Sequence, residues 1–143
     1  MCHCEISRRS LLLAAAAVLP PKCCETPDLP PAALNTNGNS FTIDLQRAPL
    51  LRKPGSSAKF TANQLDFLLS HPSKDVYVVS SRKCTHGGAP LVYNELHQSI
   101  QCTSLNHTEY DLQGNILRGP ASVKNNLKTF PVARRGHLLT VTL

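Results

Sequence analysis

Two short segments, Cys84-Thr85-His86-Gly87-Gly88 and Cys102-Thr103-Ser104-Leu105-Asn106-His107, decide how this sequence folds and what it binds. Each segment joins one cysteine to one histidine, and fifteen residues lie between His86 and Cys102. No other cysteine occurs beyond Cys24. Two thiolates and two imidazoles are enough ligands for one metal centre. The spacing therefore predicts a metal site assembled from two neighbouring loops.

Length and charge limit the classes of protein that need to be considered. A chain of 143 residues has room for one domain and a short export segment, without a second large core. The formal charge is +6, and residues 1–29 are neutral, so the whole surplus lies in residues 30–143. The basic residues are scattered, aromatic residues make up 5% and tryptophan is absent. We therefore expect an acidic partner and no nucleic-acid binding.

The first residues have the layout of a bacterial export signal. Ser7-Arg8-Arg9-Ser10 precedes nine apolar residues, 11–19, and then two prolines. The arginine pair resembles a twin-arginine signal, and the apolar run is far shorter than the roughly 20 residues of a membrane-spanning helix. We predict a signal segment and the start of a linker over residues 1–29, and a proline-rich linker over 30–39. The protein would then be periplasmic or otherwise exported. The signal segment would either be removed or remain and associate the protein with the membrane. A tail with an accidental arginine pair is the alternative.

Four cysteines, Cys2, Cys4, Cys23 and Cys24, lie near the N-terminus, and no role is assigned to them.

The remainder of the chain, residues 40–143, has the pattern of short β-strands. Alternating or β-branched runs separated by turn residues occur at 41–45, 75–80, 91–93, 99–101, 127–132 and 137–143. Residues 62–69 suit either a helical turn or a buried strand. Many short strands with turns between them predict an all-β fold, a small antiparallel sandwich or barrel. Its loops would carry the ligands.

Residues beyond the second ligand pair narrow the choice of metal centre. Tyr110-Asp111-Leu112-Gln113-Gly114 and Arg118-Gly119-Pro120-Ala121 complete a pattern that resembles the Rieske [2Fe–2S] proteins, over about residues 40–143. In that family two cysteines hold one iron and two histidines hold the other. The family's first loop reads C-x-H-x-G, and Cys84, His86 and Gly88 match it.

The resemblance implies a Rieske-type domain with a cluster-binding subdomain formed by two loops and one [2Fe–2S] cluster per chain. Its metal ligands would be Cys84, His86, Cys102 and His107. Residues that tune the cluster would be Thr108, a hydroxyl donor, Tyr110, a phenol donor to a cysteine sulfur, and Gly119 and Pro120, a loop that shields the cluster.

The second loop departs from the family pattern C-x-x-H-G-x-x-Tyr/Phe-Asp. His107 stands five positions after Cys102, and counting back from Tyr110 places Asn106 in the histidine position. We assign the ligand to His107, because asparagine is a poor ligand for iron. Many quinol-oxidising members also carry a bridged cysteine in each loop, where Ala89 and Ser104 stand in this sequence.

The expected function is electron transfer, as a periplasmic subunit of a quinol-oxidising or other respiratory complex. Its partners would be a cytochrome b-type or catalytic subunit and a c-type cytochrome. We identify no catalytic residues for bond-making chemistry, so the chain is not expected to be an enzyme alone. One alternative is a structural zinc-binding or cluster-free module of the same fold. Another is a soluble Rieske ferredoxin that supplies a cytosolic oxygenase.

Overall fold

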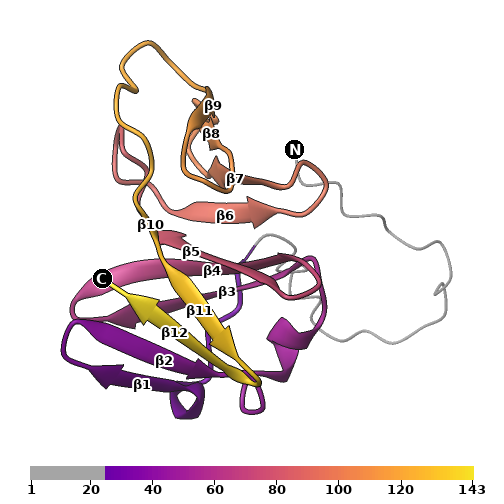
Figure 1. Ribbon diagram of the computed structural model, residues 1–143. Coiled ribbons are helices and arrows are strands. Elements are labelled where there is room, and N and C mark those ends of the chain that lie inside the picture. Colours follow the sequence, from indigo (N-terminus) through magenta and orange to yellow (C-terminus); the bar gives the residue numbers. More distant parts are fainter. Residues whose placement is uncertain (1–24) are drawn as a thin grey trace, which may run out of the picture.

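A computed structural model describes residues 25–143, which form an all-β protein with two short 3-10 turns (Figure 1). The turns are η1 (Pro31–Ala33) and η2 (Pro49–Arg52). The strands are β1 (Leu34–Asn37), β2 (Ser40–Asp44), β3 (Ser56–Ala62), β4 (Leu65–Ser73), β5 (Val76–Ser81), β6 (Leu91–Asn94), β7 (Ser99–Cys102), β8 (Glu109–Tyr110), β9 (Ile116–Arg118), β10 (Thr129–Phe130), β11 (Val132–Arg135) and β12 (Leu138–Thr142). They pair into three antiparallel sheets, which confirms the predicted fold class.

Two of the sheets, β1-β2-β12-β11 and β10-β5-β4-β3, form a sandwich with the larger hydrophobic core between them. Alternation along β2 points Phe41 and Ile43 into this core, where both are fully buried. The rings of Phe41, Phe60, Phe67 and Phe130 make a chain of contacts with centroids 5.1–5.2 Å apart. Aromatic packing of this kind contributes to the stability of the sandwich.

The third sheet, β6-β7-β8-β9, lies beyond one end of the sandwich and forms a separate subdomain (Figure 1). It has a small core of its own, made by Leu68, Cys84, Leu91, Ile100, Cys102, Tyr110 and Leu127. Both cysteines of the predicted site belong to this core. The two loops that carry them therefore lie together on the smaller subdomain, as expected.

Strand β4 is shared by the two cores because both of its faces are buried. Phe67 and Leu69 point into the sandwich, whereas Leu68 between them belongs to the core of the subdomain. The metal-site subdomain is thus built directly on a sandwich strand.

The predicted linker over residues 30–39 is part of the sandwich instead. It contains η1 and β1, and Leu34 to Asn37 pair with β2. Ahead of it, the N–H of Leu29 donates to the carbonyl oxygen of Lys59 at 2.8 Å, and the side chain of Leu29 is buried in the core. The prolines are accommodated because a 3-10 turn can begin at proline, and Ala33 at the end of this turn is buried in the core. The predicted signal features lie in residues 1–24, outside the described residues.

Two other segments can be compared with the sequence-based expectation. Of the ambiguous residues 62–69, Ala62 ends β3, residues 63–64 form a turn and residues 65–69 begin β4, so the strand alternative is the correct one. Pro131 divides the expected strand over 127–132 into β10 and the start of β11. Proline has no N–H for the ladder, which explains the division. Within the described part of the chain, no helix has the length and apolar character needed to cross a membrane.

Candidate metal centre

The first loop follows β5 and folds back on itself around Cys84. The N–H of Cys84 donates to the carbonyl oxygen of Ala89, and the N–H of Gly88 donates to that of Cys84, both at 2.9 Å. Gly88 has φ of 71°, a left-handed conformation that glycine adopts without strain. The turn buries Cys84, which is 3% exposed, and leaves His86 half-buried.

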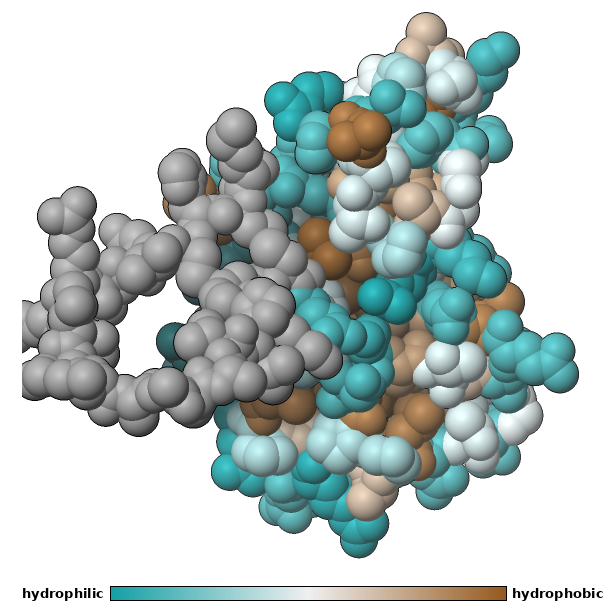
Figure 2. All heavy atoms as spheres, turned by 180° about the vertical axis from the view of Figure 1, so that it is seen from behind, coloured by the Kyte–Doolittle hydropathy of each residue, from teal (hydrophilic) through white to brown (hydrophobic). Residues whose placement is uncertain are grey.

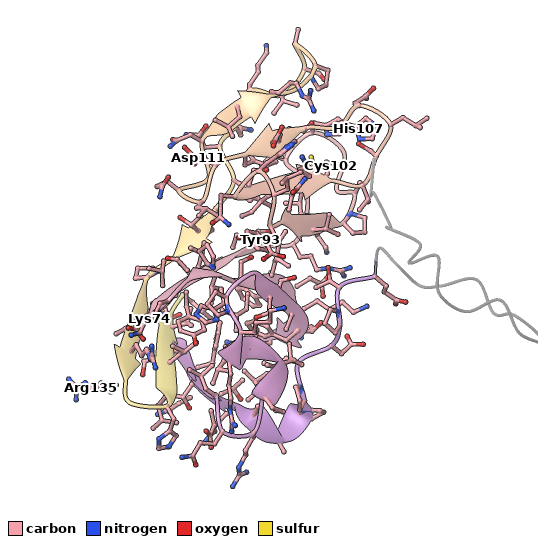
Figure 3. All side chains as sticks on the ribbon, turned by 90° about the vertical axis from the view of Figure 1, so that its right-hand side faces the viewer. Lys74, Tyr93, Cys102, His107, Asp111 and Arg135 are labelled. Carbon is pink, nitrogen blue, oxygen red and sulfur yellow. The ribbon has the colours of Figure 1, made fainter. Side chains whose placement is uncertain are left out.

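The second loop begins at Cys102, the last residue of β7. The N–H of Cys102 donates to the carbonyl oxygen of Thr108 at 2.8 Å, and the N–H of His107 donates to that of Ser104 at 3.1 Å. Figure 3 shows Cys102 and His107 in the same part of the subdomain, far from Arg135 on the sandwich. Cys102 is buried and His107 is exposed.

Three of the four predicted ligands come together. One ligand atom each from Cys84, His86 and Cys102 lies within 4.8 Å of the others. Within this group Cys84 Sγ lies 2.9 Å from His86 Nδ1. His107 is on the neighbouring loop but outside this group, so its role as fourth ligand stays a prediction.

His107 has an unusual backbone conformation, with φ of 43°. Left-handed backbone is uncommon for residues other than glycine. In the family pattern, counting back from Tyr110 places a glycine at this position. The left-handed turn at His107 therefore falls where the family pattern has glycine, one residue after Asn106.

A hydroxyl network surrounds the Cys84 sulfur. The Tyr110 phenol oxygen is 3.4 Å from Cys84 Sγ, 2.8 Å from Thr85 Oγ1 and 3.3 Å from the Thr85 backbone nitrogen. Tyr110 is fully buried. The phenol expected near a cysteine sulfur is thus within reach of Cys84, with Thr85 as a second partner.

The two cysteine thiols differ in acidity. Burial raises the pKa of Cys84, but hydrogen bonds from the His86 backbone, the Tyr110 phenol and the His86 and Cys102 side chains outweigh it and lower the pKa to about 6. Burial raises the pKa of Cys102, Ser104 opposes this, and the neighbouring Cys84 adds to it. The thiolate is the form of cysteine that binds metal. The lowered pKa of Cys84 favours this form near neutral pH.

Thr108 has a buried hydroxyl that no described group satisfies. The residue is fully buried, and its Oγ1 has no hydrogen-bond partner among the described residues. Gly119 approaches it closely, since a Cβ on Gly119 would lie 3.1 Å from the Thr108 methyl group and 3.3 Å from its hydroxyl. An unpaired buried hydroxyl is costly, and Thr108 is joined to Cys102 through its backbone carbonyl, so this hydroxyl is a candidate donor for a group bound at the site.

A third loop, residues 119–127, is hydrogen-bonded to the first ligand loop. Thr85 Oγ1 donates to the carbonyl oxygen of Asn125 at 2.9 Å, which joins this loop to the first one. The N–H of Leu127 donates to the carbonyl oxygen of Gly114 at 2.8 Å, and Leu127 is buried in the small core. Gly119 and Pro120 begin this loop, and their shielding role stays a prediction.

The carboxylate of Glu109, on β8, contacts side chains of β7, β9 and the turn between β6 and β7. Its carboxylate accepts hydrogen bonds from Ser99 at 2.5 Å and Gln101 at 3.1 Å, and it lies 3.4 Å from His97 and 3.6 Å from Arg118. Burial raises its pKa, but the hydrogen bonds from Ser99, Gln101 and His97 outweigh burial and lower it. The sequence analysis did not identify this network, because its members are spread over three strands, β7, β8 and β9, and the turn between β6 and β7.

These observations define a class: a small antiparallel β-protein that gathers cysteine and histidine ligands from two loops. Residues 44–131 match the Rieske [2Fe-2S] domain family. The chain belongs to this family. A comparison with curated proteins found no match.

Solved structures with the same fold are distant in sequence. The plasma membrane Rieske protein PetC3 of the cyanobacterium Synechocystis PCC 6803 is 18% identical, with a TM-score of 0.52, and the match covers 61% of this chain and 86% of that one. The ferredoxin of carbazole 1,9a-dioxygenase from Nocardioides aromaticivorans IC177 is 20% identical, with a TM-score of 0.52, over 63% of this chain and 86% of that one. A chain in the oxygenase–ferredoxin complex of carbazole 1,9a-dioxygenase is 17% identical, with a TM-score of 0.58, over 73% of this chain and 28% of that one.

The residues present fit the [2Fe–2S] cluster that the family and the Cys/His group imply. Cys84 and Cys102 would hold one iron, and His86 would help to hold the other. The Tyr110 phenol lies 3.4 Å from Cys84 Sγ, and the donor role expected for Thr108 stays a prediction. When bound, the cluster supplies a one-electron redox step.

Several residues of the site were not identified from the sequence. Thr85, Ser104 and Asn125 all make hydrogen bonds around the cysteines. Threonine, serine and asparagine are common in loops for other reasons, so nothing in their spacing distinguishes these three.

Proposed function

We propose that this chain is an exported electron carrier that takes single electrons from a quinol or a catalytic subunit and passes them to a c-type cytochrome. What is established is a Rieske [2Fe–2S] electron-transfer domain. The observation that carries the finer proposal is the hydrogen bonding at the ligand sulfurs. Donors such as the Tyr110 phenol stabilise the more negative reduced state and raise the potential, which favours accepting electrons from a quinol.

The surface around the site supports contact with a partner at the loops. His86 is half-buried and has Nδ1 2.9 Å from the Cys84 sulfur, so part of its ring is at the surface. Leu105, between the two ligand positions of the second loop, is 93% exposed. Elsewhere, on the face shown in Figure 2, hydrophilic side chains predominate and apolar ones are scattered over the part not covered by grey atoms.

The second candidate is a Rieske ferredoxin for an oxygenase. One of the solved structures with this fold is such a ferredoxin, and another contains a ferredoxin in complex with its oxygenase. At about 20% identity these similarities concern the fold alone. The candidates differ in potential, which for Rieske centres ranges from about −150 to +300 mV.

The first experiment tests the centre itself. Protein purified without oxygen should contain iron and acid-labile sulfide in equal amounts, with the electron paramagnetic resonance spectrum of a reduced Rieske cluster. Stoichiometric zinc with a silent spectrum would instead support the structural-zinc alternative.

The second experiment separates the two electron-transfer roles. A redox titration should give a clearly positive midpoint potential if a quinol is the donor, and one near the lower end of the range if an oxygenase is the acceptor. Cell fractionation of the wild type and of a variant with Arg8→Lys and Arg9→Lys tests export. Accumulation of the wild type in the cytoplasm would contradict the exported role.

A further inference from the structure

Cationic side chains surround a pocket on the sandwich, apart from the metal centre. The pocket has a volume of about 480 Å3 and lies between the segment after β2, strand β5 and the β11–β12 turn. Its walls are residues 45–46, Arg52, Tyr77, Arg134, Gly136 and His137. These lining residues include two guanidinium groups and no carboxylate. A pocket of this size is large enough for a small ligand.

Arg52 is held in place by two backbone carbonyl oxygens. Its Nε donates to the carbonyl oxygen of Leu45 at 3.4 Å, and its Nη2 donates to that of Gln46 at 3.1 Å. A guanidinium group has five N–H donors, so three of them keep no acceptor within the described residues. Because the side chain is already positioned, less conformational entropy is lost when a ligand binds to those donors.

Arg134 reaches the pocket from the other side and is fixed in a similar way. Its Nε donates to the carbonyl oxygen of Gly136 at 2.9 Å, and its Nη1 donates to the carboxylate of Asp75. Asp75 does not line the pocket, and it balances only one of the two guanidinium charges. The pocket therefore presents positive charge together with N–H donors.

The Tyr77 ring in the pocket wall is already engaged by other side chains. His71 stacks on it with a centroid separation of 4.2 Å and an interplanar angle of 11°, and the Arg134 guanidinium lies over the ring, 5.6 Å from its centroid. The Tyr77 hydroxyl donates to the carbonyl oxygen of Leu51 at 3.3 Å. An aromatic ligand would gain little stacking here. A compact oxyanion is favoured instead, because guanidinium groups bind phosphate through parallel N–H donors.

The surroundings of the pocket add positive charge. Lys53, Lys74 and Arg135 are sequence neighbours of the residues just described, and none of them forms an ion pair within residues 25–143. Figure 3 shows Lys74 and Arg135 on the sandwich, away from Cys102 and His107. An anion bound in the pocket would therefore not compete with a redox partner at the ligand loops.

We propose that the pocket between Arg52 and Arg134 is a binding site for a phosphate group, supplied either by free phosphate or by the headgroup of an anionic lipid. The inference goes beyond the proposed function and does not depend on it, because no metal ligand takes part in the site. The two sources share the same chemistry at the guanidinium groups, so they are separated by the choice of probe.

The test measures binding to the full chain. Isothermal titration calorimetry with inorganic phosphate tests the free anion, and cosedimentation with vesicles of phosphatidylglycerol, compared with vesicles of phosphatidylcholine alone, tests the lipid. Arg52→Gln should raise the dissociation constant by about tenfold or more, because it removes charge-assisted hydrogen bonds. Arg135→Gln is the matched control, since it removes the same charge from an exposed neighbour outside the pocket, and it should leave the dissociation constant unchanged.

Each outcome decides the inference. Saturable binding of phosphate that depends on Arg52 supports a site for the free anion, and binding to phosphatidylglycerol vesicles alone, again dependent on Arg52, supports a lipid headgroup. Absence of binding to both probes would overturn the proposal. Equal weakening in Arg52→Gln and Arg135→Gln would also overturn it, because general surface charge would then explain the binding.

A measurement on the wild type covers the case in which Arg52→Gln does not fold. In the nuclear magnetic resonance spectrum, the probe that binds should shift the side-chain Nε–H signals of Arg52 and Arg134. Shifts that leave both signals unchanged would overturn the site. Zinc in place of iron in the purified protein would overturn the proposed function and leave this inference intact.

Discussion

Thr103 binds the carbonyl oxygen of Pro90 twice, through its backbone N–H at 3.1 Å and through its hydroxyl at 2.9 Å. Pro90 closes the first loop and Thr103 opens the second, so this pair joins the two loops that carry the ligands. Ala89 and Ser104, the neighbours of these two residues, stand where many quinol-oxidising relatives have a bridged pair of cysteines. The two hydrogen bonds from Thr103 to Pro90 therefore hold the two loops together at the place where those relatives have a disulfide.

The first prediction concerns this pair. Thr103→Val keeps the backbone bond and loses the hydroxyl bond, so the free energy of unfolding should fall by about 0.5–1.5 kcal/mol. The cluster should also be lost faster on dilution into denaturant, as followed by its visible absorption. Thr61→Val is the control: Thr61 donates to Asp66 on the sandwich, and its loss should leave the rate of cluster loss unchanged. Equal rates in the two variants would show that Thr103 does not hold the loops together.

The second prediction concerns the fourth ligand. His107→Ala should abolish the cluster, whereas Asn106→Ala and His97→Ala should keep its spectrum, because an imidazole is the better iron ligand. Iron content and electron paramagnetic resonance measure this. Loss of the cluster with Asn106→Ala alone would mean that residue 106, the histidine position counted back from Tyr110, supplies the ligand instead of His107.

The third prediction concerns Thr85. Thr85→Val removes the acceptor that competes for the Tyr110 phenol proton, so the phenol should donate to Cys84 and the midpoint potential should rise. Thr85→Ser keeps the hydroxyl and should behave as the wild type in the same redox titration. A lower potential in Thr85→Val would show that Thr85 acts on the cluster through the third loop and not through the phenol.

The fourth prediction concerns Gly114. It has φ of 91°, and a Cβ at this position would overlap the carbonyl oxygen of Leu127. Gly114→Ala should therefore destabilise the protein by more than the roughly 1–2 kcal/mol of left-handed strain alone. Gly136→Ala is the matched control, with φ of 61° and open space around the Cβ, and should cost only the strain. Similar losses in chemical denaturation would contradict the close approach to Leu127.

The fifth prediction concerns pH. Burial raises the pKa of Asp111, but hydrogen bonds from the Asn115 side chain and from the backbones of Asn115, Gln113 and Gly114 outweigh it and hold the pKa below the ordinary 3.8. The folded state thus favours the carboxylate. Its stabilisation is present above pH 3.8 and is lost as the pH falls through the lower folded-state value.

Asp111→Asn should accordingly be less stable than the wild type at neutral pH, and the difference should shrink on acidification. Comparing the two proteins at each pH by chemical denaturation cancels acid effects on the cluster. A difference that stays constant down to pH 2 would mean that the charge of Asp111 contributes nothing.

Much of the fold could be predicted from the sequence because period-two alternation is strong where one strand face is buried. Residues 41–45 and the 91–101 hairpin match β2, β6 and β7 closely. Strand β3 was missed, since its inward positions are largely alanine, Ala58 and Ala62, which give weak alternation. Strands β8 and β9 are two and three residues long and are held by their neighbours, so no local pattern could reveal them.

The candidate site was predictable to a similar degree. Cysteine and histidine are rare enough for their spacing to carry information, and Cys84, His86 and Cys102 do come together. The Tyr110 phenol also reaches Cys84. The partners that depend on the arrangement of three loops, such as Asn125 for Thr85, could not be foreseen, because backbone carbonyls accept hydrogen bonds whatever the side chain.

Strand β4 gives one face to each hydrophobic core, with Leu68 on one side and Phe67 and Leu69 on the other. Unfolding of the sandwich would remove Leu68 from the small core that contains Cys84 and Cys102. Loss of iron and global unfolding should therefore coincide in a single transition. Transplanting the two loops into a foreign scaffold would likewise require a strand that is apolar on both sides.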